Sequence, residues 1–512
     1  MALFESVLTL LLLAILLLQV SRRLHIPYPT MLALAGLAVA ALPWAPAISI
    51  EPHLVLALFI APAILDAAFD FPPRAIRRYW MPLFALAVVA VLLTTAAVAW
   101  VGIEVAGLPI AAAVALGAIV APPDAAAAAA MLNRPSLPRS TVTVLKGESL
   151  LNDAVALFIF GLAVRISTTG EEAAHVLPQI AFAIPGGVLI GFVAGRIALR
   201  AMPYLTGTLG GILFQFVITF GTWIIAESLG ASAILAVVTA AMSVSRQGSK
   251  QQPARDRVHT NSVWSVVVFL LNVLAFLFVG LQARTIVLAL DAAQFRHAMG
   301  FALLVLATVV VVRIVWVMLY NRAIQPLYRW LGYGVGPSLK QGIVASWCGM
   351  RGMVTLAAAL ALPDSFPQRD LIMLTALTVV LGTLVIQGIT LEPLIRLLRF
   401  PPDSSRSDEL ELARQELAKV ADATIDGRDD EAARVLRSEL EAERIPDGDA
   451  RRESIGPVDA LRLETIRAQR EALQRMRSEG TIEEDTFHAL EQELDLSEVA
   501  AARRESFELV DS

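Results

Sequence analysis

Apolar segments long enough to cross a bilayer follow one another almost without interruption from residue 1 to about residue 400. A transmembrane helix needs ~20 mostly apolar residues. By that length the sequence predicts thirteen crossings, centred near residues 11, 37, 60, 90, 121, 153, 187, 219, 238, 270, 308, 350 and 382. We therefore expect an all-α polytopic membrane domain over residues 1–400 and a separate charged helical tail over residues 401–512.

The distribution of Lys and Arg agrees with thirteen crossings and predicts their orientation. With the N terminus outside, the inside loops carry nineteen of these cations and the outside segments carry four. Such an excess is typical of cytoplasmic loops. We expect an integral protein of the bacterial plasma membrane, with its N terminus outside and its tail in the cytosol.

Few ionisable residues fall inside the predicted crossings. They are Asp66, Asp124, Glu148, Asp153, Arg313 and Arg351. Ionisable groups at membrane depth are energetically costly, and by default they mark an ion or proton pathway. No histidine lies deep in a predicted crossing, so we expect neither a histidine metal site nor a cofactor.

Asp153 and Ser149 are four residues apart, which places both side chains on one face of a helix. A carboxylate beside a hydroxyl is a hard oxygen site that suits a small cation or a proton. Asp66, in an earlier crossing, is a candidate for a further oxygen ligand. The alternative for the 147–154 segment is a helix end with ordinary polar residues.

Two crossings contain a predicted helix break, one at Pro122 and Pro123 and the other at Gly349–Gly352. Two interrupted helices in corresponding halves of a transporter are a pointer to its binding site. A broken helix exposes partial charges at its new ends, which Asp124 and Arg351 are placed to neutralise. For Arg351 we favour this structural role. For Asp124 a structural role and direct contact with the ion stay equally open.

Glu148 precedes Asp153 by five residues, so the two carboxylates point to different sides of a helix. A buried charge requires a partner. Arg313 is the remaining cation without one, which predicts a structural Glu148–Arg313 ion pair that holds two crossings together.

Five segments resemble the monovalent cation/proton antiporters of the NhaP/NHE type. Gly147 to Asp153 is similar to that family's GESLLND signature, and Leu116 to Leu132 resembles its LGAI…TDP segment. Three more resemblances occur in order: Ala61 to Phe71 with PPILFEA, Asn261 to Leu281 with FWE…LN…F…GL, and Gly349 to Leu356 with GLRGAVSL. The resemblance covers about residues 5–400.

This resemblance implies an NhaA-like antiporter fold with inverted repeats and two interrupted crossing helices. It also implies a homodimer whose core domain slides against a dimerisation domain. The family's ion and proton ligands carry over to Asp153, Ser149, Asp66 and the backbone at Pro123. The Asn152–Asp153 pair matches the pattern associated with electroneutral one-for-one exchange, and we expect Asn152 to support the helix geometry.

Two departures leave the transported cation open. Where the family has Thr-Asp-Pro, this chain has Pro123-Asp124-Ala125, so a ligand at that point must be a backbone carbonyl. Asp66 also stands where the family often has Glu. We expect Na⁺ or Li⁺ as the substrate together with H⁺, with K⁺ as the alternative.

The tail is acidic, with thirty acidic and sixteen basic residues, whereas the membrane part is basic. The first interpretation is a solvated helical appendage with many charge pairs four residues apart. The second is a regulatory element whose acidic face docks on the basic inner loops.

Other functions fit the sequence less well. A potassium channel or efflux protein would be expected to have a carbonyl-lined filter or a nucleotide-binding tail. An intramembrane aspartyl protease would need a Gly-x-Gly-Asp signature, which is absent. We therefore expect a transporter and not an enzyme, with no nucleic-acid partner. A membrane sensor that signals through the tail is the remote alternative.

Overall fold

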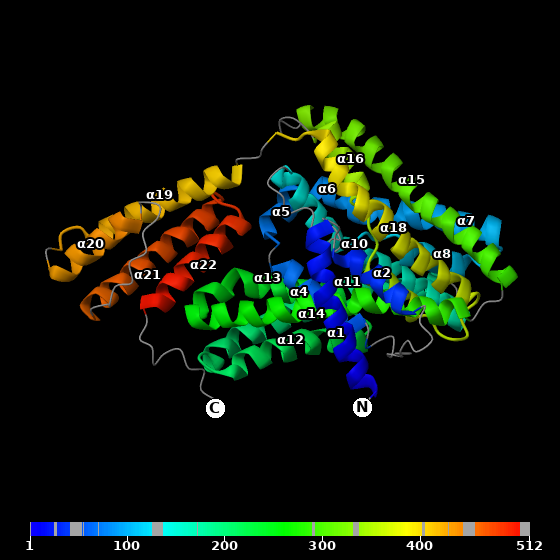
Figure 1. The fold of residues 1–512 in the computed structure, drawn as a ribbon, viewed down its shortest axis with the longest axis horizontal. Coiled ribbons are helices and arrows are strands. Elements are labelled where there is room, and N and C mark those ends of the chain that lie inside the picture. Colours follow the sequence, from blue (N-terminus) through cyan, green and yellow to red (C-terminus); the bar gives the residue numbers. More distant parts are fainter. Residues whose placement is uncertain are drawn as a thin grey trace. The chain divides into compact units, whose positions relative to one another are not determined.

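The computed structural model describes residues 2–24, 28–40, 54, 56–69, 71–124, 137–170, 173–288, 292–330, 337–401, 405–428, 430–443 and 456–501. Within these residues the regular structure is helical throughout, and no strand occurs among them. The all-α class is therefore confirmed (Figure 1).

The first helices lead up to the first predicted break: α1 (Ala2–Leu24), α2 (Tyr28–Ala40), the π-helical turn η1 (Leu56–Ile60), α4 (Ala61–Phe69), α5 (Pro73–Arg78), α6 (Trp80–Phe84), the π-helical turn η2 (Ala85–Val89), α7 (Ala90–Ala106) and α8 (Ile110–Val120). The next include most of the long ones: α10 (Arg139–Thr169), α11 (Ala173–Leu205), α12 (Leu209–Ser228), α13 (Ala233–Gln251), α14 (Ala254–Leu288), α15 (Ala292–Trp330), α16 (Leu339–Trp347), α17 (Met353–Leu360) and α18 (Arg369–Leu398). The tail adds α19 (Ser405–Ile425), α20 (Glu431–Glu443), α21 (Gly456–Glu479) and α22 (Glu484–Ala501).

Seven helical stretches among the described residues are long and apolar enough to cross a membrane. They are Trp80–Ala106, Arg139–Thr169, Phe182–Leu205, Leu209–Ser228, Ala254–Phe278, Phe295–Ile324 and Arg369–Leu398. Shorter apolar helices are found at Leu11–Val20, Tyr28–Ala40, Leu56–Phe69, Ile110–Val120 and Ala233–Ser245. A membrane protein with several crossings is thus supported, while the number thirteen and the inverted repeats stay predictions.

The chain forms two compact units. The first comprises residues 1–196, 218–243 and 266–402, and the second comprises residues 197–217, 244–265 and 403–512. The second unit therefore joins the tail with the neighbouring ends of α11 to α14.

Small side chains let the helices of the first unit pack closely. Helix α8 has the sequence IAAAVALGAIV and is buried along most of its length against α7 and α10. Helices α2 and α14 approach so closely at Gly36 and Gly280 that a Cβ on either would collide with the backbone of the other helix. Small residues at such contacts are typical of helix packing in membranes.

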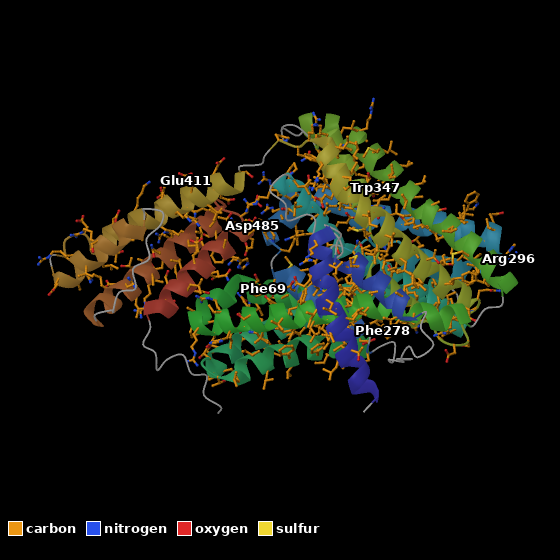
Figure 2. The ribbon with its side chains drawn as sticks, viewed as in Figure 1. Phe69, Phe278, Arg296, Trp347, Glu411 and Asp485 are labelled. Atoms are coloured by element: carbon orange, nitrogen blue, oxygen red, sulfur yellow. The ribbon has the colours of Figure 1, made fainter. Side chains whose placement is uncertain are left out.

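Both predicted breaks coincide with non-helical backbone. Helix α8 ends at Val120 and residues 121–124 are not helical, as expected where two prolines remove backbone donors. Helix α16 ends at Trp347, labelled in Figure 2, and α17 begins at Met353. Residues 125–136, which contain the continuation of the first interrupted segment, lie outside the described part of the chain.

In the second unit, helices α19, α21 and α22 pack together around one apolar cluster (Figure 1). Ile466, Leu473 and Met476 of α21 are buried in it, whereas Leu461 belongs to a neighbouring cluster with α20. The apolar side chains of α21 therefore belong to two clusters. Acidic side chains such as Glu411 and Asp485, labelled in Figure 2, belong to α19 and α22.

A buried charge network joins the tail to the start of α14 within this unit. Arg257 donates to both carboxylate oxygens of Asp495, with 3.1 Å between Nε and Oδ2. Arg470 of α21 also donates to Asp495, at 2.6 Å, and to Glu498 at the same distance. The side chains of Arg257 and Asp495 are both buried, so this is not an exposed surface pair.

Candidate functional site

The middle of α10 carries four of the predicted site residues: Glu148, Ser149, Asn152 and Asp153. Asp153 is only 8% exposed, and no hydrogen bond to its carboxylate is found among the described residues. Ser149 lies one helical turn earlier on the same side and is half-buried. The helix therefore offers a buried carboxylate and a hydroxyl side by side, as the spacing predicts.

Asn152 ties the first break to α10. Its amide nitrogen donates to the carbonyl of Pro123 at 3.0 Å, and its side chain is fully buried. Its Oδ1 is also buried and has no hydrogen-bond partner among the described residues. Since a carbonyl has two lone pairs, the Pro123 oxygen keeps one for a further ligand.

The two non-helical segments meet directly. The backbone N–H of Asp124 donates to the carbonyl of Met350 at 2.7 Å. Arg351, almost fully buried, donates from Nε to the carbonyl of Val120 at 3.0 Å and from Nη2 to that of Ala121 at 3.3 Å. Its Nη1 donates to the carbonyl of Gly349. One guanidinium thus satisfies carbonyls at the C-terminal ends of both interrupted helices.

Asp124 stabilises an N-terminal helix end, opposite in partial charge to the C-terminal ends that Arg351 contacts. Its carboxylate accepts from the backbone N–H of Met353, the first residue of α17, at 3.3 Å. A Cβ on Gly352 would collide with that carboxylate, so the close approach depends on a glycine. A negative charge at a helix N terminus and a positive charge at helix C termini are both stabilising.

Glu148 and Arg313 form a bidentate pair, the partnership that the sequence suggests. The distances are 2.6 Å from Nη1 to Oε1 and 3.1 Å from Nη2 to Oε2, and both side chains are buried. Arg313 also donates to the carbonyl of Ala345 at 2.9 Å. One turn later, Trp316 donates to the carbonyl of Ala85 at 2.8 Å. These contacts tie α15 to α10, α16 and η2.

Asp66 differs from the other acids in its exposure. It lies on α4, whose buried residues Ile64 and Ala68 belong to the same apolar cluster as Leu150 of α10. The Asp66 side chain is exposed, while Asp153 is buried. The structure therefore brings the two helices together, and the predicted part of Asp66 in ion binding stays a prediction.

Thr383 is a site residue that the sequence did not reveal. Its hydroxyl accepts from the backbone N–H of Arg351 at 3.0 Å and is itself hydrogen-bonded to the carbonyl of Val379 at 2.8 Å. Helix α18 also contains Thr375 and Thr378, whose hydroxyls bond to their own helix. Only the three-dimensional contact separates Thr383 from these two.

Comparison with known proteins shows which family this chain matches. A family model described as "Sodium/hydrogen exchanger, transmembrane" matches residues 7–397. An uncharacterized Na⁺/H⁺ exchanger of Mycobacterium bovis is 29% identical over 508 residues, which covers 93% of this chain and 92% of the relative. The sodium, potassium, lithium and rubidium/H⁺ antiporter of Bacillus subtilis is 27% identical, covering 93% of this chain and 75% of the relative.

The fold is also similar to a solved structure. The sodium proton antiporter MjNhaP1 from Methanocaldococcus jannaschii matches with a TM-score of 0.61 at 16% identity. The match covers 78% of this chain and all of the antiporter chain. At this identity the likeness concerns the fold.

Proposed function

Because the chain belongs to the sodium/hydrogen exchanger family, we propose that it exchanges a monovalent cation for protons and that the two compete for Asp153. The observation that carries the proposal is the burial of this carboxylate away from hydrogen-bond donors of the described residues. Asp153 is buried without a hydrogen-bond donor among the described residues, although a buried carboxylate needs a cation, a proton or a donor. The charges around it, in contrast, already have partners in the described structure.

The surrounding contacts support the proposal that some of the buried charges are structural and that others bind the ion. Arg351 and Asp124 are occupied with the helix ends, and Glu148 is occupied with Arg313. In the proposed site a cation binds the carboxylate of Asp153, the hydroxyl of Ser149 and the second lone pair of the Pro123 carbonyl. These are the hard oxygen ligands that such a cation prefers. Asp66 contributes once its carboxylate turns toward α10.

Exchange follows from one electrostatic restriction. Asp153 is neutralised by a proton or by a cation, and either form crosses between inward-open and outward-open states. The empty site retains an uncompensated carboxylate, which is costly in a dry interior. One carboxylate charge alternates between two monovalent partners, so the proposed stoichiometry is one for one and electroneutral. No covalent bond changes in this cycle, which makes the protein a transporter and not an enzyme.

Na⁺ or Li⁺ is the proposed cation, and K⁺ is the alternative. The name of the Bacillus subtilis relative includes sodium, potassium, lithium and rubidium, which supports testing all four on this chain. We further propose a homodimer in a bacterial plasma membrane, with residues 1–400 as the transport domain and the tail in the cytosol.

The deciding experiment uses purified protein in liposomes with an imposed pH gradient and a trapped pH dye. Na⁺, Li⁺, K⁺ and Rb⁺ are added in turn to the wild type and to Asp153→Asn, which has nearly the same shape but lacks the exchangeable charge. We expect at least one cation to collapse the gradient with the wild type only. Ser149→Ala, which removes one neutral ligand, should raise the cation concentration needed for half-maximal exchange.

Electroneutrality is tested by clamping the membrane potential with an ionophore selective for an ion other than the transported one. One-for-one exchange should run at the same rate at zero and at imposed potential. Dependence on the potential would contradict this stoichiometry and leave Asp153 in place. Equal rates for the wild type and Asp153→Asn with every cation would refute the central assignment.

A further inference from the structure

The hydroxyl of Thr383 on α18 accepts a hydrogen bond that the second helix break makes available. Residues 348–352 are not helical, so the backbone N–H of Arg351 lies outside the helical hydrogen bonds of α16 and α17. It donates to the Thr383 hydroxyl at 3.0 Å, and this hydroxyl donates onward to the carbonyl of Val379 at 2.8 Å. Thr383 and Arg351 are each only 1% exposed. Because a buried N–H without an acceptor is costly, the hydroxyl fixes the backbone of the break.

The other end of the same peptide unit reaches the first break. The N–H of Arg351 and the carbonyl of Met350 belong to one planar peptide unit. That carbonyl accepts from the N–H of Asp124 at 2.7 Å. The N–H of Asp124 in turn shares a peptide unit with the carbonyl of Pro123, the proposed cation ligand. Two planar units therefore form a hydrogen-bond chain from the Pro123 carbonyl to the Thr383 hydroxyl.

Every donor in this hydrogen-bond chain points in the same direction, away from the Pro123 oxygen and toward α18. Hydrogen bonds in such a series polarise one another, and they do so most strongly in a low-dielectric interior. Donation at the Thr383 end therefore draws the two carbonyl oxygens toward greater negative charge. This makes the Pro123 oxygen a better ligand for a cation.

The Pro123 end of the chain lies at the proposed ion site. The Pro123 oxygen accepts from Asn152 at 3.0 Å, and Asp153 is the next residue on α10. Since the peptide unit is planar, a rotation at its N–H end moves the oxygen at its other end. The hydroxyl of Thr383 thus affects both where the ligand oxygen lies and how strongly it attracts a cation, although Thr383 itself is not a ligand of the proposed site.

We propose that Thr383 is a positioning residue for the transported cation, acting through the hydrogen-bond chain on the Pro123 carbonyl. This inference rests on the exchange proposed above for Asp153. A cation requires the Pro123 oxygen in addition to the carboxylate, whereas a proton requires the carboxylate alone. Loss of the Thr383 hydroxyl therefore weakens binding of the cation and leaves the affinity of Asp153 for protons unchanged.

The test measures exchange by the full-length protein in liposomes over a range of cation concentrations at several pH values. When a cation and a proton compete for one site, the half-saturating cation concentration rises linearly with proton concentration. The intercept of that line gives the affinity for the cation, and the ratio of slope to intercept gives the affinity for the proton. The two affinities are thus measured separately in each variant.

Thr383→Val has nearly the same shape as the wild type but lacks the hydroxyl. We expect it to raise the intercept about tenfold, the factor that corresponds to one hydrogen bond, with the ratio of slope to intercept unchanged and little change in the maximal rate. At a fixed cation concentration that saturates both proteins, the acidic limit of exchange should then move up by about one pH unit.

Thr383→Ser keeps the hydroxyl and should stay close to the wild type, whereas Thr383→Ala should behave like Thr383→Val. The Ser and Ala pair provides the same comparison if Thr383→Val does not fold. Thr375→Val is the matched control. Thr375 is fully buried on α18, and its hydroxyl donates to the carbonyl of Leu371, the same bond within the helix that Thr383 makes to Val379.

Hydrogen–deuterium exchange checks the contact independently of transport. The peptide that contains Arg351 should exchange faster in Thr383→Val and Thr383→Ala than in the wild type, Thr383→Ser or Thr375→Val. An unchanged cation affinity in the first two variants, despite faster exchange of that peptide, would overturn the proposed role and leave Asp153 in place.

Two further results would also overturn the role of Thr383. One is an equal loss of cation affinity in Thr375→Val, and the other is a loss of proton affinity as large as the loss of cation affinity. Both would point to a general disturbance of the fold and not to the Pro123 carbonyl. Equal exchange by the wild type and Asp153→Asn with every cation would instead refute the proposed function, and this inference with it.

Discussion

Arg351 and Asp124 illustrate how single charges are stabilised at the centre of this protein. Each lies at helix ends of opposite partial charge and is hydrogen-bonded to backbone groups that the breaks leave without helical partners. This arrangement agrees with the structural role favoured for Arg351. For Asp124 it provides a structural contact, while direct contact with the ion stays a prediction.

Replacing Arg351 by Lys should be costly although the charge is conserved. An ammonium group cannot reach the carbonyls of Val120, Ala121 and Gly349 together, since it lacks the planar fork of the guanidinium. We expect a loss of about 3 kcal/mol in stability, from two lost charge-assisted hydrogen bonds, seen as a lower unfolding temperature in detergent. Arg369→Lys, in a partly exposed position, is the control and should change little.

The Glu148–Arg313 pair is best examined with a double-mutant cycle. Glu148→Gln or Arg313→Met alone leaves one buried charge without its partner and should cost about 3 to 5 kcal/mol. The double variant should recover much of that loss. Expression yield and unfolding temperature measure the three variants. An Arg313→Met protein that folds and transports normally would show that the pair is dispensable.

At the scale of elements, the site depends on two interrupted helices that cross through backbone contacts. Asp124 bonds to the carbonyl of Met350, and Arg351 bonds to the end of α8. The crossing positions the Pro123 carbonyl beside α10 through Asn152. The geometry of the proposed ion site is therefore set by backbone as much as by side chains.

Gly352→Ala tests this crossing. The added Cβ would collide with the Asp124 carboxylate and push it away from the N terminus of α17. We expect exchange in liposomes to fall at least tenfold, with a loss of stability of about 1 to 3 kcal/mol, as for overpacking in a core. Gly161→Ala on α10 is the control because a Cβ at that position would meet no atom within 4 Å. Normal exchange by Gly352→Ala would mean that the contact is not needed.

At the scale of the whole molecule, the question is whether the tail is a passive appendage. Asp495 accepts from both Arg257 and Arg470 in a buried setting. Exposed ion pairs contribute little, whereas breaking a buried pair is strongly destabilising. The contact with the start of α14 agrees with the interpretation of a tail that docks on a basic inner loop, and the regulatory role stays a prediction.

Asp495→Asn should loosen this contact, because Arg257 and Arg470 both lose the Asp495 carboxylate and Arg470 keeps that of Glu498. We expect faster hydrogen–deuterium exchange in α22 and in the peptide around Arg257. If the tail is regulatory, the pH dependence of cation/proton exchange in liposomes should shift as well. Arg414→Gln is the control, since its partner Glu493 and Arg414 itself are exposed. The Arg257→Asp, Asp495→Arg exchange of charges should restore part of the protection.

The sequence alone determined the helical class, the candidate charges and both breaks, because these follow from local chemistry. Apolar length indicates crossings, Pro122–Pro123 and the glycines at 349 and 352 interrupt helices, and Glu148 and Arg313 were the two charges that still required partners. The helix breaks and the partners of Arg313, Arg351 and Asp124 agree with that reasoning.

Only the tertiary structure decided which groups approach one another across distant segments. It brought Thr383 to the backbone of Arg351, Asn152 to the carbonyl of Pro123, and Asp495 to Arg257, and it left the carboxylate of Asp66 exposed. Such contacts depend on the packing of helices far apart in the chain, and periodicity and spacing report only on residues within one helix.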